Sequence, residues 1–138
     1  MQVNTYLIFN GQCEAAFKFY EQSLDAQIKF MMTHGESPLA AHVSPEWRSK
    51  IIHGTLALGE QLLMASDAPP DHYEKPQGFS VSIQVTDPGD AERKFQALSA
   101  NGKVTMPMQE TFWAVRFGMV VDQFGIPWMV NCPKTPPA

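Results

Sequence analysis

TYLIFNGQCEAAFKFYEQSL (residues 5–24) is the stretch that decides the fold, because VSIQVTDPGDAERKFQALSA (residues 81–100) repeats its pattern. Each stretch opens with apolar residues at alternate positions, typical of a strand, and continues with apolar residues at helical spacing. The first predicted helix is Cys13–Leu24, and the second has a good N-cap in Asp87 and a favoured first residue in Pro88. The sequence therefore predicts a duplicated strand-helix unit.

The two stretches align at an offset of 76 residues, which is 81 minus 5. Leu7 then corresponds to Ile83, and Phe19 corresponds to Phe95. Each helix is followed by three strand-like stretches with turn residues between them. These are residues 27–33, 52–58 and 61–65, and then 103–107, 112–121 and 126–131. We expect one domain over 1–138, with halves at about 1–67 and 79–132 and a connector at about 68–78.

The composition excludes several classes of protein. At 138 residues and 15.4 kDa the chain is long enough for one core but too short for two independent ones. Ten basic residues against fourteen acidic ones argue against a nucleic-acid partner. No apolar run reaches the roughly 20 residues that cross a bilayer, so we expect no membrane partner and a cytoplasmic location. Cys13 and Cys132 lack zinc-like spacing and are expected to be free thiols.

Short motifs along the chain carry a resemblance to a known family. They are YLIFNG (6–11), HGTL (53–56), LMASD (63–67), FW (112–113), RFG (116–118), DQFG (122–125) and WMVN (128–131). In this order they resemble the PhnB-like branch of the vicinal oxygen chelate superfamily, which includes glyoxalase I, extradiol dioxygenases, and bleomycin and fosfomycin resistance proteins. The resemblance implies an α+β fold of tandem βαβββ modules, whose curved mixed sheets enclose a pocket, commonly across a homodimer. An open sheet with one helix also has a second face that must be covered.

Metal-dependent relatives, by this resemblance, hold a divalent ion with His or Glu on the first and last strands of each half. The corresponding positions here fall near Asn4 or Thr5, Met64 or Ala65, residues 80–82, and residues 129–131. None of these is a His or a carboxylate, which are the ligands such an ion requires. We therefore expect no cofactor, and a divalent metal is the disfavoured alternative.

The candidate ligand-binding residues are His53, Met64, Trp113, Arg116 and Trp128. His53 shares a strand face with Thr55, and two roles are open for it. It could be a general base or hydrogen-bond donor in a pocket, or a structural histidine bonded to a loop backbone. Met64 lies where the metal-dependent members carry a carboxylate.

Trp113 and Trp128 could stack on a planar ligand, and Arg116 could hold a carboxylate or phosphonate. The alternative for Arg116 is a structural ion pair with Asp122 or Glu110. Strand alternation places Trp113 and Arg116 on opposite faces unless a bulge intervenes, so one of them should be structural.

Three functions stay open. The preferred hypothesis is a protein that binds a small organic molecule in a concave, largely apolar pocket without the usual metal. The alternatives are a metal-dependent lyase, isomerase or transferase, and a bleomycin-type drug-sequestering resistance protein. Cys13 begins a predicted helix, where the dipole could lower its pKa, so a reactive thiol is weighed against a buried, idle one.

Overall fold

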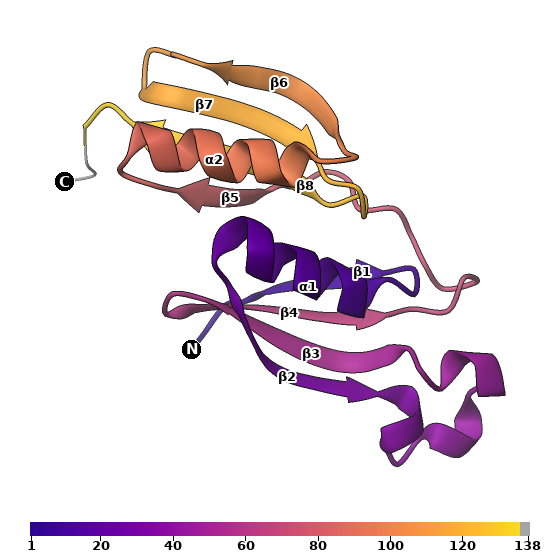
Figure 1. Cartoon of the computed structure of the whole chain (residues 1–138). Coiled ribbons are helices and arrows are strands. Elements are labelled where there is room, and N and C mark those ends of the chain that lie inside the picture. The colour runs from indigo at the N-terminus through magenta and orange to yellow at the C-terminus, as the bar shows by residue number, and fades with distance from the viewer. Residues whose placement is uncertain (136–138) are drawn as a thin grey trace. The chain divides into compact units, whose positions relative to one another are not determined.

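The computed structural model describes residues 1–135, which form two compact units, the first spanning Met1–Glu74 and the second beginning at Lys75. The boundary falls inside the predicted connector, 68–78. In each unit one helix lies across one face of a four-stranded sheet (Figure 1). Neither helix in the described part of the chain has the length and apolar character needed to cross a membrane.

The first unit contains β1 (Thr5–Phe9), α1 (Cys13–Leu24), β2 (Gln27–Thr33), β3 (Ile51–Leu58) and β4 (Gln61–Asp67). Its strand order is β1-β4-β3-β2, with β1 and β4 parallel and the other pairs antiparallel. Between β2 and β3 the chain forms three short 3₁₀ turns, His34–Glu36, Ala40–His42 and Pro45–Trp47.

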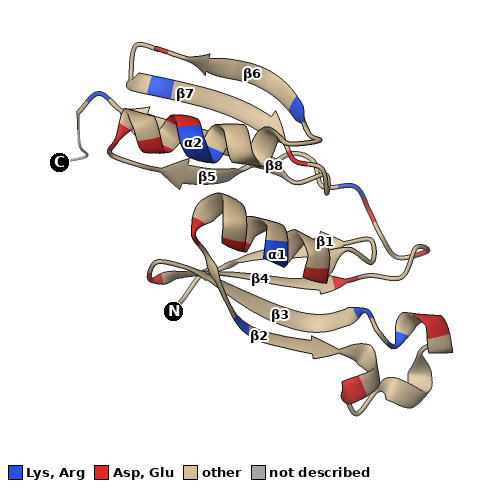
Figure 2. Cartoon of the chain, in the orientation of Figure 1, with Lys and Arg blue, Asp and Glu red and all other residues tan. Residues whose placement is uncertain are grey.

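The second unit contains β5 (Val81–Gln84), α2 (Pro88–Ser99), β6 (Lys103–Gln109), β7 (Ala114–Val121) and β8 (Pro127–Pro133). Its order, β5-β8-β7-β6, repeats that of the first unit, with a parallel β5/β8 pair. The predicted tandem βαβββ fold is thereby confirmed. Most of both sheets is uncharged, and charged residues lie mainly on helices, turns and strand ends (Figure 2).

The helices pack their buried residues closely on the sheets. A Cβ added to Gly54 of β3 would lie 3.2 Å from Phe17 of α1, and one added to Gly118 of β7 would lie 2.7 Å from Phe95 of α2. Gly118 therefore allows α2 to approach its sheet, because any side chain at this position would overlap the Phe95 ring.

The predicted matching of the two helices was wrong by one residue. Tyr20 is fully buried and takes the place in α1 that Phe95 takes in α2, whereas Phe19 is only partly buried. The helices begin at Cys13 and Pro88, an offset of 75 (88 minus 13), whereas β1 and β5 begin at an offset of 76 (81 minus 5), as do β2 and β6 (103 minus 27). The loop between strand and helix has three residues in both units, 10–12 and 85–87, and the difference comes from β5, which is one residue shorter than β1.

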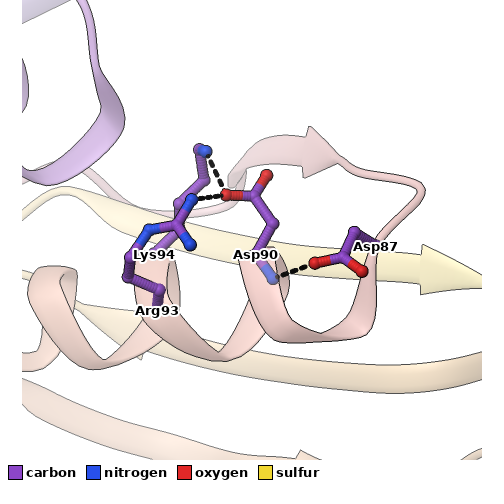
Figure 3. A network of polar contacts seen from close by, with 4 residues as sticks. All are labelled: Asp87, Asp90, Arg93 and Lys94. Carbon is purple, nitrogen blue, oxygen red and sulfur yellow. Dashed lines mark hydrogen bonds and ion pairs between the residues drawn. The ribbon is translucent and has the colours of Figure 1, made fainter.

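The two helices begin in different ways. At the start of α2, the Asp87 side chain accepts a hydrogen bond from the Asp90 backbone N–H at 2.8 Å, and Asp90 pairs in turn with Arg93 and Lys94 (Figure 3). The start of α1 has no such local cap. Its first N–H groups must be satisfied from elsewhere in the fold.

Asp67 supplies the missing cap from the far end of β4. One carboxylate oxygen accepts from the Cys13 backbone N–H at 2.9 Å, and the other accepts from the Ile51 N–H at 2.9 Å. The side chain is 4% exposed. The predicted strand ended at residue 65 and left Asp67 in a loop, which was wrong, because β4 continues to Asp67.

Candidate functional site

Each sheet has one face covered by its helix and another that we call the open face. Along β3, Gly54 faces α1, which places His53 and Thr55 on the open face. Along β8, buried Val130 pairs with Gly118, which faces α2, and this places Asn131 on the open face. Candidate ligand-binding residues can therefore be sorted by the face on which they lie.

The open face of the first sheet brings together Tyr6, His53 and Met64. The Tyr6 hydroxyl lies 3.1 Å from His53 Nδ1, and the two rings stack with centroids 5.7 Å apart. Phe30 of β2 lies on the side of His53 away from Tyr6, with its ring centroid 6.1 Å from that of His53. Met64 is the direct strand partner of Tyr6. His53 thus bonds to a side chain of β1 rather than to a loop backbone.

Sequence reasoning did not single out Tyr6 as a candidate site residue. The available signal was its position: it alternates with Leu7 and Phe9, which are both buried against the helix side. Tyr6 is 43% exposed and carries a hydroxyl beside the only histidine in the strands of this unit.

The open face of the second sheet carries a row of four hydrogen-bonded side chains, which we call the amide chain. Trp113 Nε1 donates to Asn131 Oδ1 at 3.2 Å, Asn131 Nδ2 donates to Gln84 Oε1 at 2.8 Å, and Gln84 Nε2 donates to Ser82 Oγ at 3.0 Å. Gln84 and Asn131 are direct partners on the parallel strands β5 and β8. Ser82 and Asn131 lie at positions considered for metal ligands, whereas Gln84 was missed.

Aromatic rings border the amide chain at the Trp113 end. The Trp113 ring packs edge-on against Phe112 at 4.8 Å and against Phe117 at 5.2 Å between ring centroids. Trp113 is 42% exposed and Phe112 is 88% exposed. This face therefore joins an accessible aromatic cluster to a line of amide and hydroxyl groups.

Arg116 lies on the helix side of its sheet. Its Nε donates to Glu92 of α2 at 2.6 Å, and its Nη2 contacts the same carboxylate and the Met108 carbonyl oxygen. Arg116 thus forms the structural ion pair given as its alternative role, but with Glu92 rather than with Asp122 or Glu110. A bulge falls between Ala114 and Arg116. The Trp113 side chain nevertheless lies on the open face and the Arg116 side chain on the helix side.

Trp128 is also turned toward the helix side and is 1% exposed. Its Nε1 donates to Asp122 Oδ2 at 2.8 Å, while Asp122 Oδ1 accepts from the backbone N–H groups of Phe124 and Ile126. Neither Arg116 nor Trp128 is presented to the open face. Their surroundings support structural roles.

Cys13 is completely buried at the start of α1. Burial raises the pKa of the Cys13 thiol far above its usual range, and the nearby carboxylates of Asp67 and Glu14 raise it further. The reading of Cys13 as a thiol activated by the helix dipole is therefore wrong.

The chain belongs to the Glyoxalase/Bleomycin resistance protein/Dioxygenase superfamily, whose family profile matches residues 2–130. It is similar to protein YjdN of Escherichia coli K12, with 35% identity over 145 aligned residues covering 99% of both chains. The crystal structure of PA1353 from Pseudomonas aeruginosa has a TM-score of 0.88 and 45% identity, covering 96% of this chain and 98% of that one. A PhnB protein from Bacillus cereus shares the fold, with a TM-score of 0.81, 22% identity and coverage of 96% and 99%. The predicted superfamily is confirmed.

The residues present do not fit the divalent-metal site that this superfamily implies. Within residues 1–135, no three His, Cys, Asp or Glu side chains gather closely enough to hold an ion. In β1, β3, β4, β5, β7 and β8, His53 is the only His, Asp, Glu, Lys or Arg on an open face. The only such residues in β2 and β6 are Lys29 and Lys103, which as cations do not bind metal ions. Asp67 and Arg116 are engaged on the helix sides. One imidazole with neutral side chains is a poor donor set for such an ion.

Proposed function

We propose that this protein binds a small organic molecule through aromatic rings and uncharged hydrogen-bonding groups on the open faces of its sheets, without a catalytic metal. One observation carries the proposal: on each open face a large, partly exposed ring is hydrogen-bonded to a polar side chain. Tyr6 is paired with His53, and Trp113 is paired with Asn131.

Such pairs suit ligand recognition because they are already ordered. Small-molecule sites are lined mostly by apolar and aromatic side chains, with a few polar groups that set the ligand's orientation. A ring held by its own hydrogen bond offers a flat stacking surface and loses little conformational freedom when a ligand binds. His53 adds an imidazole whose ring nitrogens can donate or accept a hydrogen bond.

The proposal includes a homodimer, because an open sheet face with large exposed rings needs a cover. We expect the dimer to form at micromolar concentration and to give twice the chain mass of 15.4 kDa in size-exclusion chromatography with light scattering. A mass equal to one chain at all accessible concentrations would remove this part of the proposal.

The test compares a panel of planar aromatic compounds by saturation-transfer NMR on wild type, His53→Ala and Trp113→Phe. His72→Ala is the matched control, since this histidine lies exposed in the connector, with its side chain 68% exposed. We expect several compounds to bind wild type and the control, with loss of signal in at least one open-face variant. Equal binding by all four proteins would contradict the proposal.

The metal-dependent alternative is tested on the same proteins. Titration calorimetry with Zn²⁺, Ni²⁺, Mn²⁺ and Fe²⁺ should give no stoichiometric binding to wild type. Tight binding of one ion per chain that His53→Ala abolishes would instead favour a metal-dependent lyase, isomerase or transferase. Titration with bleomycin addresses sequestration: tight binding of that drug, but of none of the planar panel, would favour a resistance protein.

A further inference from the structure

In the amide chain of Trp113, Asn131, Gln84 and Ser82, every hydrogen bond runs in the same direction from donor to acceptor. An indole N–H donates and cannot accept, so the oxygen of Asn131 must face Trp113. The Asn131 nitrogen then faces Gln84, whose oxygen must accept, and the Gln84 nitrogen faces Ser82. Trp113 thereby sets the orientation of both amides.

This direction decides which hydrogen-bonding groups stay available to a ligand. Each amide oxygen already accepts a bond within the chain, while each amide nitrogen keeps its second hydrogen. The Ser82 oxygen accepts from Gln84, so its hydroxyl hydrogen is also free to donate. The open face thus presents a line of donors that ends beside an aromatic cluster.

The charge around this line agrees with an electron-rich ligand. β5 and β8, which carry Ser82, Gln84 and Asn131, contain no Asp or Glu that would repel an anion. They also contain no Lys or Arg, so the hydrogen-bond donors that these two strands offer are neutral. Hydrogen bonds from neutral donors to a carboxylate are charge-assisted and stronger than bonds between neutral groups.

We propose that the open face of the second sheet binds a planar aromatic carboxylate. The carboxylate accepts hydrogen bonds from the side-chain amides of Gln84 and Asn131, and the ring stacks at Trp113. Gln84 and Asn131 face each other across neighbouring strands about 4.8 Å apart, so one carboxylate can reach both amides. This inference rests on the proposed function and names its ligand class.

The experiment titrates sodium benzoate into the full-length ¹⁵N-labelled protein and follows side-chain amide signals. The Asn131 and Gln84 signals are identified by their disappearance in Asn131→Asp and Gln84→Glu. We expect benzoate to shift both signals at millimolar concentration, cyclohexanecarboxylate to bind more weakly, and benzylammonium to leave them unchanged.

Asn131→Asp and Gln84→Glu test whether the free amide N–H groups bind the carboxylate. Asn131→Asp keeps an oxygen for Trp113 but replaces the free donor with a negative charge, and Gln84→Glu does the same one strand away. We expect each to weaken benzoate binding by at least about tenfold, or about 1.4 kcal/mol, and Asn131→Asp to gain affinity for benzylammonium. Gln96→Glu is the matched control, because Gln96 is exposed on α2 and the change adds the same charge elsewhere.

Each outcome bears on the inference separately from the proposed function. Loss of binding in both open-face variants, with retention in Gln96→Glu, supports it. An equal loss in Gln96→Glu would show general charge repulsion and overturn it. If benzoate fails to bind while a neutral aromatic compound binds the open faces, the inference is overturned and the proposed function stands. If no panel compound binds either face, both fall. Dispersed amide spectra show that each variant is folded.

Discussion

Changing Asp122 to Asn and Trp128 to Phe, singly and together, tests whether these residues form a structural unit on the helix side of the second sheet. Asp122 is 3% exposed and accepts hydrogen bonds from the backbone N–H groups of Phe124 and Ile126 and from Trp128 Nε1. Asparagine can keep the two backbone bonds through its oxygen. Its nitrogen then faces the indole N–H, so that two donors oppose each other.

The magnitudes follow from these contacts. A hydrogen bond to a buried charged group contributes about 1.5–3 kcal/mol, so Asp122→Asn should lower the free energy of unfolding by about 2–3 kcal/mol. Trp128→Phe loses the same bond and some packing, and should cost about 2–3 kcal/mol. In the double variant the opposed donors are gone. Its cost should therefore fall short of the sum of the single costs by about 1.5 kcal/mol.

The measurement is urea unfolding followed by far-ultraviolet circular dichroism, with the slope of the transition checked for constancy among variants. Trp113→Phe is the control, because its indole bond is exposed, and it should change stability by less than about 0.5 kcal/mol. Additive costs within about 0.3–0.5 kcal/mol would refute the coupling. If a ligand raises the stability of wild type against urea but not that of Trp128→Phe, Trp128 belongs to the binding site.

Three further predictions address stability and reactivity. Asp67→Ala leaves the buried N–H groups of Cys13 and Ile51 without their acceptor and should cost about 3–4 kcal/mol in urea unfolding, whereas a loss below about 1 kcal/mol would deny the cap its role. The thiols of Cys13 and Cys132 are both buried, so neither should react rapidly with a chromogenic disulfide reagent at pH 8 unless the protein is unfolded; fast reaction of one thiol would disprove this. The hydrogen bond from Lys94 lowers the pKa of Asp90, so the stabilisation is present above the unfolded-state pKa of about 4 and is lost as pH falls through the folded-state value. Asp90→Asn should therefore cost about 0.5 kcal/mol at pH 7 and nothing in strong acid, and a cost independent of pH would contradict the assignment.

Local patterns in the sequence were sufficient for the elements and their order. The predicted helix Cys13–Leu24 and strand Gln27–Thr33 have the bounds that the structure shows, and Asp87 caps α2 as expected. These features depend on residues within one or two turns of each other, where the spacing of apolar side chains and the chemistry of caps act directly. The helix match failed by one residue because β5 is one residue shorter than β1, which apolar spacing does not reveal.

The candidate sites depended on contacts between residues far apart in the chain. Tyr6 of β1 meets His53 of β3 across the intervening strand β4, and Gln84 meets Asn131 on the neighbouring parallel strands β5 and β8. In both cases the two residues are 47 positions apart in the sequence. Strand alternation predicted that one of Trp113 and Arg116 would be structural, but it could not say which face the helix covers. The sequence by itself determined the two modules and the scarcity of metal-binding side chains. Only the tertiary structure decided which rings and amides share an open face, since that depends on strand pairing and on where each helix packs.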